Sequence, residues 1–254
     1  MRNIPSNFSP KRRNARRRRP DCRASAGFTL IEMLVVIAII ALLATLISSG
    51  VSKALLTARR TQCLSNMRQI GLGVITYATE NRGRLPPTRH SAGAEEAWVT
   101  VLAPYLGEMD TIRICPMDPK GAERLARGGT SYLANDLIFD TRTDPFGQVL
   151  DGSLGNLSLI DNPSRTFLAV IASDDRGTGA TNDHTHAGQW TSWNRFLSDV
   201  EADRFRRGGR HHTRLRGESN YLYGDGGVRS LRAATLKEWI EEGRNPGEAN
   251  NAPR

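Results

Sequence analysis

The sequence has few of the residues that build metal or nucleophile sites. Its 254 residues include only three cysteines, Cys22, Cys63 and Cys115, and none stands in the CxxC or Cys/His spacing of a zinc ribbon. No nucleophile elbow and no paired-carboxylate pattern occurs. Because no motif for catalysis is present, we expect a structural or binding protein rather than an enzyme.

Acidic residues are almost absent from residues 1–27, which hold nine Lys or Arg and only Asp21 as an acid. This segment carries +8 of the formal net charge of +9, so the rest of the chain is nearly balanced. A basic arm that binds nucleic acid would look similar. This one adjoins a long apolar run, so we interpret it as a membrane topology signal, and no nucleic-acid partner is expected.

Charged side chains are missing altogether from the twenty residues Met33–Ser52. A helix of that length spans about 30 Å, enough to cross the hydrocarbon core of a bilayer. The excess of arginine before it predicts that its N-terminal side stays in the cytoplasm. The chain after Lys53 is then exported.

A secretory signal peptide has the same order of basic and apolar regions. Here, however, the apolar run is longer than a usual signal core, and no A-x-A-like cleavage site follows it. The small residues come before it instead, at Ala24–Gly27. Cleavage there would leave the membrane helix on the mature protein.

Glu32 is the one acid near the start of the apolar run. A carboxylate in lipid costs several kcal/mol unless it is neutralised or paired. Cleavage after Gly27 would make Phe28 the new N-terminus, with an α-amine that is mostly protonated at neutral pH. The amine of a neighbouring subunit could then pair with Glu32. A Glu merely tolerated near the membrane interface is the alternative.

The segment Gly27–Leu46, with the sequence G-FTLIEMLVVIAIIALLATL, resembles the type III signal of type IV prepilins and type II secretion pseudopilins. The resemblance implies that a membrane aspartyl peptidase cleaves after Gly27 and methylates the amine of Phe28. Glu32 matches the position through which such subunits assemble. The leader differs from many pilin leaders because it is longer and richer in arginine.

After the apolar run the helical pattern continues to a stop signal at Asn81–Gly83. Apolar side chains recur there at three- and four-residue steps and form one stripe: Cys63, Met67, Ile70, Val74, Tyr77 and Ala78. This pattern predicts one helix from Phe28, its first half in lipid and its second half packed on a domain. Gly50, Gly71 and Gly73 are positions where it could bend.

The chain after Pro86 is rich in Gly, Pro and Asp. A hairpin turn at Gly224–Gly227 accompanies three predicted strands, Thr166–Ala172, Asn220–Tyr223 and Val228–Leu231. A short helix over Thr235–Glu242 follows. Loops are expected around 88–97, 140–156 and 174–190. The predicted fold class is α+β and pilin-like, with a long N-terminal helix packed on a small antiparallel sheet.

This region also resembles a branch of pilin-like proteins from environmental bacteria. The matching segments are Cys63–Pro87, CPMDP (Cys115–Pro119), SYLAN (Ser131–Asn135) and NYLYGDGGV (Asn220–Val228). Members often end in a His-x9-Asp-Gly motif. The spacing differs here, because twelve residues separate His212, and thirteen separate His211, from Asp225-Gly226. Asp225 is expected to cap the hairpin turn.

Side chains with ligand or redox chemistry are scattered through the exported part. Cys63 and Cys115 could form a disulfide outside the cytoplasm, or remain two buried thiols. Asp174, Asp175 and Asp183 form a weak calcium candidate, since some pseudopilins bind calcium in such loops. His184, His186, His211 and His212 are weaker candidates for a transition metal. No other cofactor is indicated.

The residues and the resemblance together predict a pilin or pseudopilin of a type IV pilus or type II secretion system. Its expected partners are a prepilin peptidase, other subunits and an inner-membrane assembly platform. We expect a single-pass protein of the bacterial inner membrane, with the leader cytoplasmic and the C-terminal domain periplasmic or extracellular. The expected divisions are a removed leader 1–27, transmembrane half-helix 28–52, exported half-helix 53–82, globular domain 83–242 and flexible tail 243–254.

A second hypothesis is a binding protein that uses a pilin-type anchor to display a domain to an extracellular ligand or nucleic acid. Its support is a group of basic residues in the exported part: Arg204, Arg206, Arg207, Arg210, Arg214 and Arg216. Such a group is equally consistent with a solvated face. A bitopic enzyme, the third class, has no motif behind it.

Overall fold

The computed structural model describes residues 27–89, 97–107, 109–141, 146, 148, 154–206 and 208–253. The chain divides into two compact units, residues 1–49 and 50–254. Helix α1 (Leu30–Glu80) begins in the first unit and ends in the second. This confirms the predicted long N-terminal helix.

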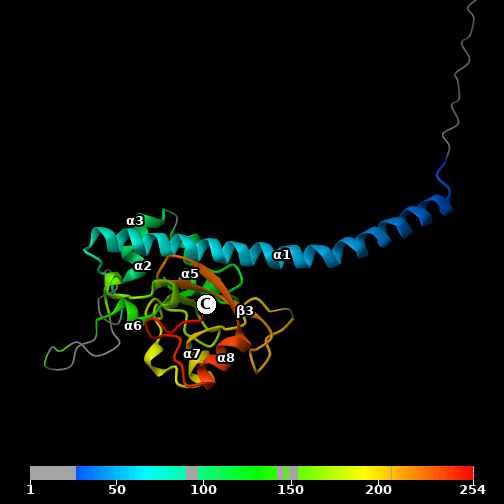
Figure 1. The fold of residues 1–254 in the computed structure, drawn as a ribbon. Coiled ribbons are helices and arrows are strands. Elements are labelled where there is room, and N and C mark those ends of the chain that lie inside the picture. The colour runs from blue at the N-terminus through cyan, green and yellow to red at the C-terminus, as the bar shows by residue number, and fades with distance from the viewer. Residues whose placement is uncertain are drawn as a thin grey trace, which may run out of the picture. The chain divides into compact units, whose positions relative to one another are not determined.

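Beyond α1, the second unit is made of short helices around one sheet (Figure 1). The strands are β1 (Tyr132–Ala134), β2 (Phe167–Ile171), β3 (Glu218–Tyr223) and β4 (Val228–Arg232). The helices are α2 (Trp98–Val101), α3 (Ala103–Leu106), α4 (Met109–Ile112), α5 (Gly121–Ala126), α6 (Asp136–Phe139), α7 (Trp193–Asp199) and α8 (Ala233–Glu241). Three 3-10 turns complete it, η1 (Leu157–Leu159), η2 (Pro163–Arg165) and η3 (Ala187–Gln189).

The sheet is antiparallel, with its four strands in the order β1-β2-β3-β4. The predicted hairpin is confirmed: β3 pairs with β4, with Leu222 opposite Val228. Asp225 caps the turn as expected, because its Oδ1 accepts a hydrogen bond of 2.8 Å from the Gly227 N–H. The protein therefore has the predicted α+β, pilin-like fold.

The apolar stripe of α1 packs on one face of this sheet. Cys63, Met67, Ile70, Val74 and Ala78 are each at most 1% exposed, in one core that includes residues of β2 and β3. A second core lies on the other face of the sheet, where side chains of α7 and α8 meet the tyrosines of β3. The sheet is thus covered on both faces, by α1 and by the C-terminal helices.

Gly71 marks a close approach between α1 and the β3–β4 hairpin. A Cβ atom at Gly71 would lie 2.6 Å from Leu222 Cδ1, and one at Gly73 would lie 3.0 Å from Leu106 Cδ2. The sequence suggested that these glycines could bend the helix. Instead α1 is continuous through both, and the missing side chains let its neighbours approach.

The described residues after Gly243, where we expected a flexible tail, pack against the rest of the domain. Ala252 is fully buried, and the Pro253 carbonyl accepts a hydrogen bond of 2.5 Å from the Tyr223 hydroxyl. The Gly247 carbonyl accepts another, of 2.7 Å, from Asn135 Nδ2. The polar composition of the tail is offset by hydrogen bonds to distant parts of the domain, so the tail closes the second core.

Replacement of Ala252 by Asp tests this packing. The charge would be buried without a partner, so the free energy of unfolding should fall by about 2–4 kcal/mol. Urea denaturation of the full chain in detergent measures it. The matched control is Glu248→Gln, an exposed tail position, which should change it by less than about 0.5 kcal/mol. Equal free energies of unfolding for the two variants would contradict this packing and support a flexible tail.

Candidate functional site

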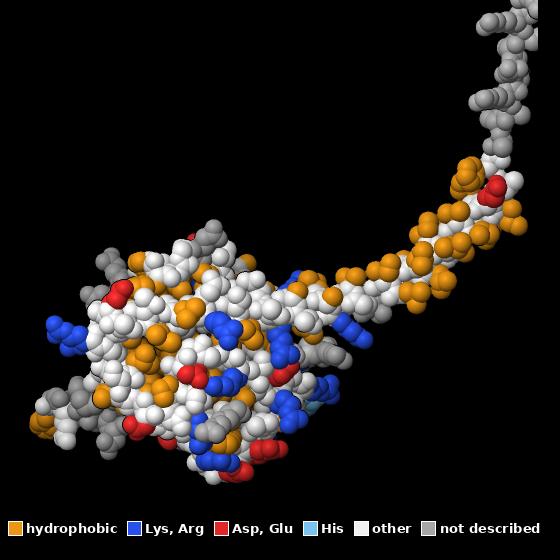
Figure 2. Space-filling model, turned by 45° about the horizontal axis from the view of Figure 1, so that its top comes forward, with side chains coloured by type: hydrophobic (Ala, Val, Ile, Leu, Met, Phe, Trp, Pro, Cys, Tyr) orange, Lys and Arg blue, Asp and Glu red, His pale blue; other side chains and the backbone are white. Residues whose placement is uncertain are grey.

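The first half of α1 exposes apolar side chains all around its circumference. Phe28 is 74% exposed and Ile37 is 61% exposed, and no described side chain from 27 to 47 is buried. Figure 2 shows hydrophobic side chains covering the visible face of this segment. The helix is long and apolar enough to cross a membrane. A helix apolar on every side requires lipid or other protein around it.

Glu32 and Thr29 form a capping box at the start of α1. The Thr29 N–H and hydroxyl both donate to Glu32 Oε2, at 2.8 and 2.7 Å, and the Glu32 N–H donates to Thr29 Oγ1 at 3.3 Å. The T-x-x-E spacing that produces this arrangement was present in the sequence, but its capping role was overlooked. The carboxylate therefore has a local role besides the predicted pairing between subunits.

The predicted cleavage position lies just outside the helix. Gly27, Phe28 and Thr29 precede α1 without regular structure, and their side chains or backbone are exposed. The rest of the leader, residues 1–26, lies outside the described residues. An exposed, non-helical peptide bond is what a peptidase requires, and the arrangement places the apolar helix immediately after it.

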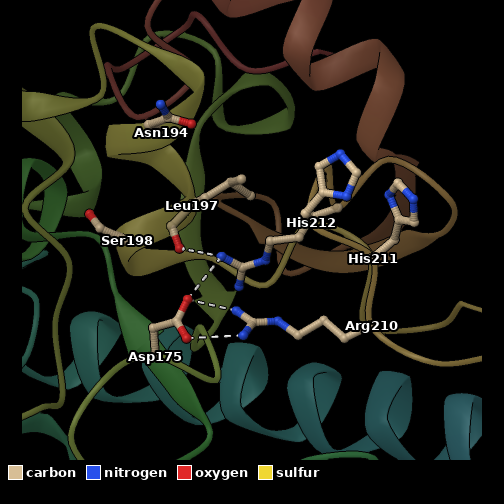
Figure 3. A pocket seen from close by; sticks show the side chains of 8 residues that line it. Asp175, Asn194, Leu197, Ser198, Arg210, His211 and His212 are labelled. Atoms are coloured by element: carbon tan, nitrogen blue, oxygen red, sulfur yellow. Dashed lines mark hydrogen bonds and ion pairs between the residues drawn. The ribbon is translucent and has the colours of Figure 1, made fainter.

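The other candidate is a pocket of about 540 Å³ in the second unit. Asn194 and Ser198 of α7 line one side, and His211 and His212 line the other (Figure 3). The two imidazoles lie close, with ring centroids 4.1 Å apart. Partial burial, followed by the charges of Arg216 and His212, lowers the pKa of His211. Its ring is therefore neutral at neutral pH.

The arginines beside this pocket pair with carboxylates and do not form a free basic patch. Arg210 binds both oxygens of Asp175, at 3.0 and 2.6 Å, and Arg204 binds Asp174 at 2.6 Å. Arg214 contacts both Glu201 and Asp175. Arg204 and Arg214 are buried, so the expected basic or solvated face does not include them, whereas Arg210 is exposed. Arg206 also faces acids, Arg216 is exposed, and Arg207 lies outside the described residues.

Glu201 is the acid at the centre of this ion-pair cluster, and it is fully buried. Burial alone would raise its pKa, but hydrogen bonds from Arg214 and the Asp174 N–H hold the pKa below its usual value. Burial raises the pKa of the adjacent Asp203, with the negative charge of Glu201 adding to the effect. Glu201 is therefore the ionised acid that fixes the arginines.

The three calcium candidates have different partners: two belong to the ion-pair cluster, and the third lies outside it. Asp174 and Asp175 face arginines, whereas Asp183 accepts hydrogen bonds from the Arg89 N–H at 3.2 Å and contacts His184 at 2.8 Å. Among the residues that the structure describes, no group of three or more His, Cys, Asp or Glu side chains could hold a metal. The structure gives the proposed calcium site no support.

The four candidate histidines form two pairs. His184 and His186 lie near each other, with ring centroids 5.4 Å apart, and His186 is 3.9 Å from Asp199. His211 hydrogen-bonds Thr213. Asp225, by contrast, pairs with Arg229 at 2.8 Å in its own hairpin. Asp225 thus contacts its own hairpin, whereas His211 and His212 line the pocket.

Cys63 and Cys115, the two residues of the disulfide prediction, belong to the same hydrophobic core. Both are free thiols and both are buried. Burial, with the neighbouring Cys115 adding to the effect, raises the pKa of Cys63 well above its usual value. The bridge itself stays a prediction.

Comparison with known families agrees with this geometry. The Prokaryotic N-terminal methylation motif matches residues 22–48, and a Protein of unknown function (DUF1559) matches residues 56–120. The chain is therefore a pilin-like protein with a prepilin-type methylation motif followed by a DUF1559 segment. The motif implies processing by a prepilin peptidase and a membrane anchor, and proteins of this type are generally not enzymes. No curated protein and no solved structure matches the chain.

Glu201→Gln tests the ion-pair cluster. Loss of the buried charge leaves Arg214 with only the more exposed carboxylate of Asp175, so the free energy of unfolding should fall by about 2–4 kcal/mol at neutral pH. Because the folded-state pKa of Glu201 is lowered, its contribution is present above the ordinary Glu pKa and is lost as the pH falls through the lowered one.

The difference in free energy of unfolding between wild type and Glu201→Gln should therefore become smaller below about pH 4 in a series of urea denaturations. Glu241→Gln is the control, because its pair with Lys237 is largely exposed and is worth less than about 1 kcal/mol. A gap that stayed constant down to pH 3 would show that Glu201 contributes by shape and not by charge.

Proposed function

We propose that this protein is a structural subunit, a pilin or pseudopilin, of a type IV pilus or a type II secretion system. The observation that carries the proposal is the exposed apolar circumference of α1 directly after an exposed Gly27–Phe28 bond. Lipid covers such a helix before assembly, and the helices of neighbouring subunits cover it afterwards. The same surface serves both states because both surroundings are apolar.

The proposed processing fixes the chemistry of the N-terminus. A prepilin peptidase cleaves after Gly27 and methylates the amine of Phe28, and residues 28–52 remain as the membrane-spanning half of the helix. The leader stays in the cytoplasm, and residues 53–254 enter the periplasm or leave the cell. The anchored chain then joins other subunits at an assembly platform in the inner membrane.

Glu32 supports assembly by pairing with the Phe28 amine of a neighbouring subunit. Its Oε2 already accepts two hydrogen bonds from Thr29, which satisfies part of the carboxylate before assembly. A carboxylate can accept about four hydrogen bonds, so capacity for a cation remains. The capping box thus lowers the cost of holding a charge in lipid while the partner amine is absent.

The display hypothesis receives less support from the structure. Its basic residues are largely engaged by acids of the same chain, as the pairs of Arg204, Arg210 and Arg214 show. Binding of an anion there would compete with existing pairs. The structural role needs no such rearrangement, because its surface is already exposed.

Processing is tested by intact mass spectrometry of membrane-extracted protein. The chain should begin at an N-methylated Phe28, and Gly27→Leu should accumulate as precursor because the peptidase cannot accommodate a large side chain there. Ala24→Ser, which keeps a small residue in the leader, should be processed like wild type. A mature chain that began beyond residue 50 would instead indicate an ordinary signal peptide.

Assembly is tested by separating the charge of Glu32 from its capping role. Glu32→Gln keeps an oxygen that accepts from Thr29 but removes the charge. It should be inserted and processed, yet be at least about tenfold depleted in sheared fibres or cross-linked ladders, since an unpaired amine in lipid costs well over 1.4 kcal/mol. Glu32→Leu should behave alike, and Glu32→Asp should be intermediate.

Thr29→Val is the matched control for these variants. It removes the capping hydroxyl and keeps the carboxylate, so the helix start loses about 1 kcal/mol while assembly continues. The opposite pattern, with Glu32→Gln in fibres and Thr29→Val absent from them, would assign Glu32 to capping alone. The pairing between subunits would then be wrong.

A further inference from the structure

The two buried cysteines lie where α1 meets the rest of its domain. Cys63 is on the apolar stripe of α1, and Cys115 lies in the loop between α4 and α5. They are 0% and 1% exposed. Their contact therefore joins the N-terminal helix to a segment that follows it by about fifty residues.

Asn66 holds this loop in register against α1. Gln62 Nε2 donates to Asn66 Oδ1 at 2.8 Å, which orients the amide. Asn66 Nδ2 then donates to the Thr111 and Ile114 carbonyls, at 3.3 and 3.0 Å. Asn66 is one helical turn from Cys63, and Ile114 directly precedes Cys115. These bonds hold the segment before Cys115 against the turn of α1 that carries Cys63.

The surroundings distinguish the two sulfurs. The Tyr132 hydroxyl donates to Cys63 Sγ at 3.4 Å. Burial opposes ionisation of Cys115, but hydrogen bonds from Cys63 and the Met117 N–H, together with the charge of Arg204, lower its pKa.

We propose that Cys63 and Cys115 form a disulfide that ties α1 covalently to the globular domain. The inference rests on the proposed export of the domain, because disulfides persist outside the cytoplasm. The bond closes a long loop around the α1 contact, so it constrains the unfolded chain strongly. It would keep the helix and the domain together when other contacts open.

The oxidant required is the disulfide of a thiol–disulfide oxidoreductase. One cysteine thiolate attacks a sulfur of that disulfide and forms a mixed disulfide, releasing one thiolate of the carrier. The second cysteine then attacks the mixed disulfide, which forms the Cys63–Cys115 bond and releases the carrier as a dithiol. Two electrons pass to the carrier, and its two sulfurs take up the two protons that the cysteines lose. Burial of both sulfurs places this exchange before α1 docks.

The test is intact mass spectrometry of the full chain, extracted from membranes under acid and alkylated with iodoacetamide in denaturant. The expected species starts at Phe28 and carries no alkylated thiol, and it gains two after reduction. A mature monomer with two alkylated thiols before reduction overturns the bridge. A disulfide-linked dimer that reduction resolves overturns it as well.

Cys22 lies in the leader, so the number of alkylated thiols distinguishes a missing bridge from missing cleavage. A chain that kept its leader and carried one alkylated thiol before reduction would show the bridge formed and the cleavage absent. A chain from Phe28 with two such thiols would show the reverse. The two proposals can therefore fail independently in one spectrum.

Stability measurements give a second readout on the same protein. Cys63→Ser and Cys115→Ser should each lower the melting temperature by about 5–15 °C, and the double variant should lie no lower than the singles. Reductant should lower the melting temperature of wild type to that of the cysteine variants. Additive losses in the double variant would indicate two packed thiols and overturn the bridge.

Discussion

The close packing of α1 against the sheet is the contact on which the domain depends. Every residue of the stripe from Cys63 to Ala78 faces the same core, and the absence of a side chain at Gly71 lets Leu222 approach the helix backbone. Buried apolar area of this kind supplies most of the stability of a small domain. The sheet has its second core on its other face, so its strands are held between two layers. One helix face therefore determines where the strands, the hairpin and the α4–α5 loop lie.

The same helix meets two different requirements along its length. Its N-terminal half exposes apolar side chains in every direction, whereas its C-terminal half buries one stripe and leaves polar side chains such as Arg68 and Gln69 outside. A membrane-spanning subunit needs the first property and a folded domain needs the second. The acid at Glu32 departs from the first requirement, and its carboxylate accepts capping hydrogen bonds from Thr29. In the second unit, Arg204, Arg210 and Arg214 pair with acids of the same unit.

Local patterns account for the parts of the structure that could be predicted. The three- and four-residue apolar spacing gave the stripe of α1, and the Gly224–Gly227 turn gave the β3–β4 hairpin, because both signals lie within a few residues of chain. The Thr29–Glu32 capping box was equally local, and its spacing could have been recognised. The candidate cleavage site was visible for the same reason: small residues, an aromatic and an apolar run follow one another directly.

The remaining features depend on contacts between distant segments. Arg210 meets Asp175, and Arg204 meets Asp174, only because the loop after β2 folds against the chain between α7 and β3. Composition alone made those arginines look like a surface patch. The tail from Gly243 looked flexible for a similar reason, since its polar residues find their partners in Asn135 and Tyr223. Short helices such as α2 and α4 have four residues each and carry too little periodicity to be recognised.

The contacts between α1 and the hairpin also determine how the domain would carry mechanical load. Arg60 of α1 pairs with Glu218 at the start of β3, and Gly71 lies against Leu222 near its end, so the two elements touch at separated points. A pull along the helix axis would load those points together, as shear, instead of opening them one after another. Tension applied through the N-terminal helix would therefore have to break both contacts together.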